Sequence, residues 1–175
     1  MFLAADFVGQ EITFPGPGSN SSTWLLTEQI SENLRSRPKE WCDEYGFKSE
    51  VRGVFYCSKV AGEGPDEAVI KIIMQTPWKG SEVQSSEKRA LQKLKTDHID
   101  EEAEALVIFR RVNCSSAPQL IASKVVEQSK NMCVPGGFLG FIAKTRLPGV
   151  TIPWMNRLTE EEGEAMRRSF RESWM

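Results

Sequence analysis

The sequence predicts an α+β fold: a mainly antiparallel sheet of about five strands packed on a helix, with further helices at both ends. Three observations carry this prediction. The segment 68–74 alternates with period two, which is typical of a strand. The segment 50–60 alternates in the same way and is joined to it by a turn rich in glycine and proline, which predicts a hairpin. The segment 82–95 then carries Val83, Ala90, Leu91 and Leu94 at helical spacing.

The elements before the hairpin are predicted from loop composition and helical spacing. Residues 14–22 have the glycine, proline and serine content of a loop. A helix is expected from Thr23 to about Arg35, since Leu26, Ile30 and Leu34 are spaced by four residues. A short amphipathic turn is expected at Lys39–Tyr45.

The elements after the hairpin include two further strands and a terminal helix. Ser81 and Gln84 predict a capping box for the helix that carries Glu87. Leu106–Arg111 fits either a strand or the end of a second helix, and strands are expected at Pro118–Val126 and Phe138–Thr145. Thr159 and Glu162 predict a capping box for the last helix, whose apolar stripe is Met166, Phe170 and Trp174.

Length and composition fit one domain, or one lobe of something larger. The 175 residues divide into a helical amino-terminal extension or lid (1–45), a central lobe (46–149), and a hinge extension with the last helix (150–175). The net charge of −2 gives no basic field for nucleic acid. No apolar run approaches the roughly 18 residues that span a membrane, so we expect a cytoplasmic protein.

The cysteines and the single histidine do not predict a metal site. Cys42, Cys57, Cys114 and Cys133 are far apart, which indicates free thiols in a reducing compartment. His98 lies in an acidic, polar stretch and is expected at the surface.

One charged pair stands out from this apolar framework. Lys71 lies in the middle of the most apolar strand, and Glu87 lies on the apolar stripe of the helix that follows it. A buried lysine and a buried glutamate each cost several kcal/mol unless they are paired. We therefore expect Lys71 and Glu87 to form an ion pair.

The order of these elements resembles the amino-terminal lobe of the protein-kinase-like superfamily, with aminoglycoside-phosphotransferase-like and uncharacterised fungal kinase-like proteins as the nearer likeness. The resemblance covers about residues 50 to 175 and rests on the segments 68–75, 87–94, 114–120, 134–149 and 168–174. It implies that Lys71 and Glu87 form the catalytic, phosphate-holding pair. It also implies ligand-binding roles for Val69 and for hinge residues Phe141, Ala143, Lys144 and Thr145.

The chain departs from a complete kinase in several motifs. It has no glycine-rich phosphate loop and no Asp-Phe-Gly, and its only histidine, in His98-Ile99-Asp100, has no asparagine downstream at the spacing of a catalytic loop. Phosphoryl transfer depends on metal ions and a catalytic base that such motifs provide. We expect a truncated, pseudokinase-like lobe that lacks the second lobe and phosphotransferase activity, and that binds a small molecule, a nucleotide or a protein partner around Lys71.

Alternatives to this interpretation stay open at this point. The lobe could be a repurposed small-molecule enzyme of fungal secondary metabolism, a cyclase or isomerase that uses an apolar cavity, or an incomplete gene product. No cofactor or metal is expected, although ATP is considered as a ligand. Large apolar groups in Val150–Met155 and in the last helix predict a homodimer or a lid made by the first 45 residues.

Overall fold

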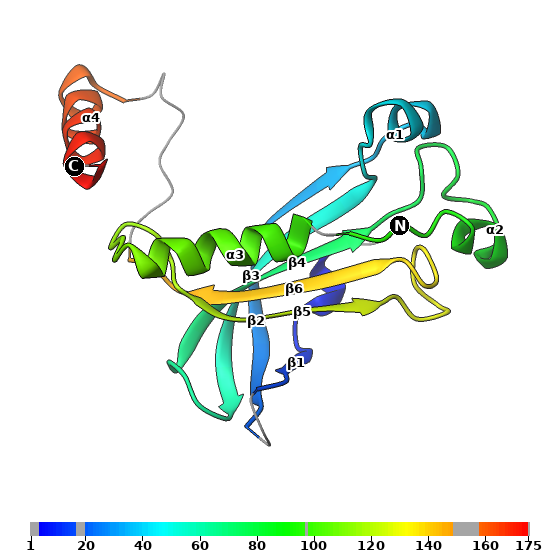
Figure 1. Ribbon diagram of the computed structural model, residues 1–175, viewed down its shortest axis with the longest axis horizontal. Helices are drawn as coiled ribbons and strands as arrows, with labels where there is room; N and C mark the ends of the chain where they lie inside the picture. The colour runs from blue at the N-terminus through cyan, green and yellow to red at the C-terminus, as the bar shows by residue number, and fades with distance from the viewer. Residues whose placement is uncertain (1–3, 17–19, 97, 149–157, 175) are drawn as a thin grey trace.

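A six-stranded antiparallel sheet organises the computed structural model, which describes residues 4–16, 20–96, 98–148 and 158–174 (Figure 1). The strand order is β1-β2-β3-β4-β6-β5. The elements along the chain are η1 (Ala4–Phe7), β1 (Glu11–Phe14), β2 (Ser22–Arg35), α1 (Lys39–Tyr45), β3 (Glu50–Ala61), β4 (Glu67–Gln75), α2 (Ser86–Ala90), α3 (His98–Arg111), β5 (Leu120–Glu127), β6 (Phe138–Thr145) and α4 (Glu160–Trp174). The α+β class is confirmed, with six strands in place of the expected five or so.

The lysine strand β4 lies inside the sheet, between β3 and β6. Its alternation is also confirmed, since one face is buried in the larger apolar cluster and the other faces helix α3. The first face consists of Ala68, Ile70, Ile72 and Met74, all at most 2% exposed. The glycine-rich turn joins β3 to β4 as a hairpin, with Glu50 opposite Gln75 and Ser58 opposite Glu67.

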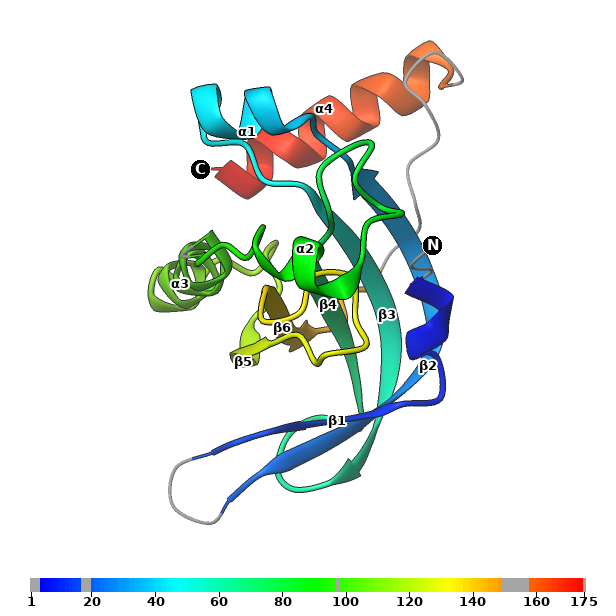
Figure 2. The ribbon, with the colours of Figure 1, turned by 90° about the vertical axis from the view of Figure 1, so that its right-hand side faces the viewer.

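The sheet curves strongly, so that its first strand bends back toward its last (Figure 2). The Lys124 ammonium on β5 donates to the Thr13 carbonyl on β1 over 2.7 Å, and this contact joins the two edges. The concave face encloses a core built around fully buried side chains, among them Phe14, Trp24 and Phe55. Because large side chains fill this interior, it is a packed core.

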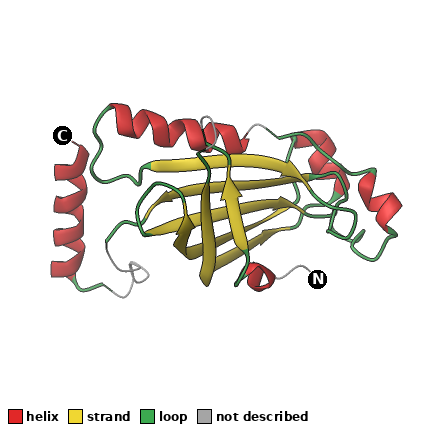
Figure 3. Cartoon of the chain, turned by 90° about the horizontal axis from the view of Figure 1, so that it is seen from below, coloured by secondary structure: helices red, strands yellow, loops and turns green. Residues whose placement is uncertain are grey.

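Helix α3 lies along the other face of the sheet, over β6 and β5 (Figures 1 and 3). Its buried residues Ile99 and Leu106 pack against Ile73, Phe138 and Ile142. An ideal Cβ on Gly140 of β6 would lie 2.2 Å from the Ile99 Cδ1 atom. The missing side chain at Gly140 therefore allows α3 to approach the sheet closely.

The helix expected at Thr23–Arg35 is a strand, β2, and this expectation was wrong. Its spacing of four residues is a multiple of two, so Leu26, Ile30 and Leu34 fit a strand face as well as a helix stripe. Pairing decides between them, because β2 is hydrogen-bonded to β3 from Thr23 opposite Ala61 to Arg35 opposite Glu50. Glu11–Phe14 and Ser22–Arg35, within the expected helical extension, are therefore strands of the sheet.

The long helix expected at 82–95 is reduced to α2, with five residues. Val83 and Leu91 are 95% and 84% exposed, so the apolar stripe has no core to pack on. The Ser81 hydroxyl donates to the Trp78 carbonyl, and α2 begins only after Ser85, so the predicted capping box at Ser81 is wrong. The long helix is α3, which includes Leu106–Arg111.

The carboxyl-terminal helix α4 starts at the predicted capping box. The Thr159 N–H donates to the Glu162 carboxylate over 2.8 Å, and the Glu162 N–H donates back to the Thr159 hydroxyl over 3.3 Å. Phe170 on the expected stripe is 63% exposed. Val150–Met155 and the Trp174 side chain lie outside the described residues, and dimerisation stays a prediction.

Candidate functional site

Lys71 lies on the face of β4 that is turned toward helix α3. Its Nζ atom is 2.5 Å from the Glu102 Oε2 atom on that helix, and the two side chains are 16% and 29% exposed. Glu102 follows the buried Ile99 by three residues and precedes Leu106 by four, so it shares the face of α3 that packs on the sheet. The pair joins the central strand to the helix in a part-buried setting.

Glu87, the expected partner of Lys71, is a surface residue in α2. A hydrogen bond from its own backbone N–H, together with the Ser85 side chain, lowers the pKa of Glu87. The expectation of a Lys71–Glu87 ion pair is therefore wrong. Lys71 does have a carboxylate partner, but this carboxylate comes from α3, because α3 and not α2 covers this face of the sheet.

Lys144 lies beside this pair, as one of the predicted ligand-binding residues. It is the cross-strand partner of Val69, two residues from Lys71 on the same face of β4. Burial lowers the pKa of Lys144, whereas the Glu102 carboxylate raises it and the Lys71 ammonium lowers it. Two lysines thus share one carboxylate, which leaves an excess positive charge at a half-buried place.

Phe141 and Ala143, also predicted as ligand-binding, lie on the opposite face of the sheet. Both belong to the packed interior and are 4% and 0% exposed. The Thr145 hydroxyl accepts the Gln119 N–H over 2.9 Å. Because side chains alternate along β6, Phe141 and Ala143 cannot share a site with Lys144. The structure brings together Val69, Lys71 and Lys144, and it separates the other predicted residues from them.

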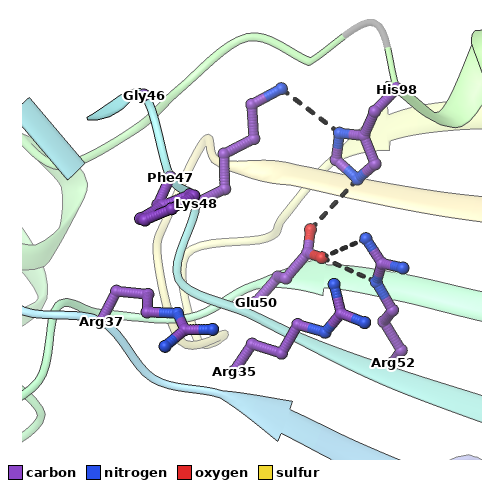
Figure 4. A pocket seen from close by; sticks show the side chains of 8 residues that line it. All are labelled: Arg35, Arg37, Gly46, Phe47, Lys48, Glu50, Arg52 and His98. Carbon is purple, nitrogen blue, oxygen red and sulfur yellow. Dashed lines mark hydrogen bonds and ion pairs between the residues drawn. The ribbon is translucent and has the colours of Figure 1, made fainter. Parts of the chain in front are cut away.

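A second polar contact links α3 to the sheet one turn before Glu102. The His98 Nε2 atom is 3.1 Å from the Glu50 Oε2 atom, and Glu50 is 3% exposed. The Arg52 guanidinium donates to the other Glu50 oxygen, with Nε at 2.7 Å and Nη2 at 2.6 Å (Figure 4). His98 is 19% exposed. The expectation of a surface histidine was wrong, because His98, the first residue of α3, lies against Glu50, the first residue of β3.

A pocket of about 310 Å³ opens beside this network (Figure 4). Its lining residues are Arg35, Arg37, Gly46, Phe47, Lys48, Glu50, Arg52 and His98. They come from the end of β2, the loop before α1, the loop before β3, the start of β3 and the start of α3. Sequence reasoning missed this site because these residues are charged side chains from segments that are far apart in the chain.

No protein family, curated protein or solved structure matches this chain. Within the described residues, no helix is both long enough and apolar enough to cross a membrane. The same residues contain no group of three His, Cys, Asp or Glu side chains that could hold a metal ion. The cysteines are free thiols.

Proposed function

We propose that this chain is a kinase-like lobe that binds a small anionic molecule around Lys71, and that its 175 residues transfer no phosphoryl group. The observation that carries the proposal is the ion pair between Lys71 on β4 and Glu102 on α3, with Lys144 beside it. In protein kinases, a strand lysine that pairs with a helix glutamate holds the phosphates of the nucleotide.

The order of elements supports the same proposal. The chain runs from the hairpin β3–β4, with its lysine, through α3, with its glutamate, to β5, β6 and α4. This is the order on which the resemblance to the kinase amino-terminal lobe rests. With Glu102 in the role first assigned to Glu87, the lysine and glutamate of that comparison come into direct contact.

The local charge supports an anionic ligand over a neutral one. A part-buried ion pair can be purely structural, since such pairs contribute little net stability. Here Lys144 adds a second cation, and burial lowers its pKa, so its charge is imperfectly compensated by the protein. An anion placed between the two ammonium groups would remove this imbalance.

The sequence explains why we expect binding without transfer. Phosphoryl transfer needs metal ions and a base to position the nucleophile. The sequence contains no Asp-Phe-Gly, and its His-x-Asp run, at His98-Ile99-Asp100, is not followed by an asparagine at the spacing of a kinase catalytic loop. Lys71 and Glu102 alone can hold a phosphate but cannot organise its transfer.

The alternative of a cyclase or isomerase with an apolar cavity is less well supported. That reading requires Lys71 to face an enclosed apolar space. The enclosed side of the sheet is instead filled by Phe55, Ile70, Phe141 and their neighbours, and Lys71 lies on the other side. A binding site on the face beside α3 therefore agrees better with the geometry.

Calorimetric titration of the purified chain with ATP, with and without Mg²⁺, tests the proposal. We expect Lys71→Met to weaken ATP binding by roughly tenfold or more, the effect of losing about one charge-assisted contact. The matched control is Lys88→Met, at an exposed lysine of α2, which should leave binding unchanged. Lys71→Met alone leaves the Glu102 carboxylate without its lysine and can destabilise the fold. The double variant Lys71→Met/Glu102→Gln removes both charges, so a loss of ATP binding in it is not due to an unpaired carboxylate.

Two results would contradict the proposal. Equal ATP affinity in the Lys71→Met and Lys88→Met variants would remove the site from this face of the sheet. Transfer of labelled phosphate from ATP by the purified chain, abolished by Lys71→Met, would show that the chain is an active kinase.

A further inference from the structure

The basic pocket at the start of α3 can have a function of its own. We propose that the pocket lined by Arg35, Arg37, Lys48, Arg52 and His98 binds a small phosphate monoester, at a site separate from Lys71. The inference does not depend on the proposed function, because it stands on different residues and on a different cavity.

Two arginines in this pocket, Arg35 and Arg37, form no ion pair within the described residues. The Arg37 guanidinium instead lies over the Phe47 ring, 5.7 Å from its centroid. Figure 4 shows the Arg35 and Arg37 guanidinium groups on one side of the pocket, with His98 across from them. Both groups are therefore available to a ligand.

Glu50, the carboxylate among the described lining residues, does not pair with these arginines. The Arg52 guanidinium contacts one Glu50 oxygen, and the His98 Nε2 atom lies 3.1 Å from the other. Lys48 donates to the Thr96 hydroxyl over 3.2 Å and lies 3.3 Å from the His98 Nδ1 atom. Within the described residues, Arg35 and Arg37 are thus two cations of the lining that Glu50 does not pair with.

The start of α3 reinforces this positive potential. A helix of this length has unpaired N–H groups and a positive dipole end at its first turn, both of which favour phosphate. His98 is the first residue of α3 and lines the pocket. Asp100 and Glu101 in the same turn oppose the effect, but both are exposed, where solvent screens them. The dipole end and the arginines act in the same direction.

The chemistry of the pocket selects a phosphate monoester over other anions. The planar guanidinium fork matches two phosphate oxygens, and two such forks suit a dianion better than a monoanion. The pocket volume of about 310 Å³ is at the small end of ligand sites, enough for a phosphate with a sugar-sized body. The Phe47 ring offers an apolar wall for that body.

The test is calorimetric titration at low ionic strength with ribose 5-phosphate, and with ribose as the uncharged probe. We expect ribose 5-phosphate to bind and ribose not to bind. The double variant Arg35→Gln/Arg37→Gln should weaken binding by roughly tenfold or more. Urea denaturation of the same variant establishes that it is folded.

The matched control is Arg110→Gln/Arg111→Gln, which makes the same charge change at two exposed residues at the other end of α3. We expect full affinity from this control. The proposal is overturned if ribose 5-phosphate shows no binding, or if the two arginine double variants lose affinity equally. It is also overturned if Lys71→Met removes the binding, since the pocket would then not be a separate site.

Discussion

Replacing Gly140 with alanine should push helix α3 away from the sheet. Gly140 lies on β6 beneath the buried Ile99 of α3. An ideal Cβ there would approach three Ile99 atoms, Cδ1 at 2.2 Å, Cγ1 at 2.9 Å and Cγ2 at 3.1 Å. Rotating the end of the Ile99 side chain would relieve the first contact but not the other two, because they involve both branches. The helix or the strand must therefore move.

The expected cost follows from overpacking of a filled core. Inserting a methyl group without room costs about 1–3 kcal/mol. Alanine recovers roughly 0.5–1 kcal/mol of this, because glycine in a strand loses more conformational entropy on folding. Taken at the middle of both ranges, the net loss is about 1.3 kcal/mol, which corresponds to a fall in Tm of roughly 2.5–5 °C for a protein of this size.

Urea denaturation followed by circular dichroism measures this loss, and a double variant assigns its cause. Ile99→Ala alone should cost about 2–5 kcal/mol through the cavity that it leaves. In the Ile99→Ala background, Gly140→Ala should cost nothing or be stabilising, because the added methyl group then fills space. The coupling between the two substitutions is the signature of their contact.

Gly163→Ala in helix α4 is the matched control. A Cβ at Gly163 would meet only the Arg167 side chain, at 3.7 Å or more, and alanine is the better helix former. We expect it to leave stability unchanged or slightly raised. Additive effects of Gly140→Ala and Ile99→Ala would refute the argument that Gly140 sets the distance between α3 and the sheet.

Three further predictions concern single side chains. Burial raises the pKa of Cys57 to about 12, so at pH 8 only about one thiol in ten thousand is ionised. Iodoacetamide reacts with the thiolate, so it should label Cys57 far more slowly in the folded protein than after denaturation, as measured by mass spectrometry. Equal labelling rates would contradict its burial. Burial lowers the pKa of Lys144, so near pH 10.5 the unfolded chain binds more protons than the folded chain. The free energy of unfolding should therefore rise with pH in this range, relative to the Lys144→Met variant. Parallel curves of unfolding free energy against pH for the two proteins would contradict this prediction. Gln128→Leu should lower the free energy of unfolding, measured by urea denaturation, by roughly 3 kcal/mol or more. The substitution removes the hydrogen bonds of Gln128 to the Gln75 and Phe138 carbonyls and to the Val134 N–H. A loss near zero would mean that other groups satisfy these three backbone atoms.

The parts of the fold that depend on local pattern could be predicted from sequence. The hairpin β3–β4 was predicted because its alternation and its glycine-rich turn are contained within about 25 residues. The strand β2 was not, because its spacing of four satisfies both periodicities and only pairing with β3 decides between them.

The candidate site shows the same limit. Burial of Lys71 predicted that a carboxylate must accompany it, but not which one, since Glu87 and Glu102 both lie on helices after β4. The choice depends on which helix covers the sheet. The basic pocket brings Arg35 and His98 together across the fold, and no local pattern connects them.

The two polar contacts between α3 and the sheet have opposite polarity, and this fixes the position of the helix along its own axis. At the first contact, the imidazole of His98 comes from the helix and the carboxylate of Glu50 comes from the sheet. At the second contact, one turn later, the carboxylate of Glu102 comes from the helix and the ammonium group of Lys71 comes from the sheet. A slide by one turn, about 5.4 Å, would move Glu102 toward Glu50 and set two carboxylates against each other. The alternating polar contacts and the close fit of Ile99 on Gly140 therefore both favour one register.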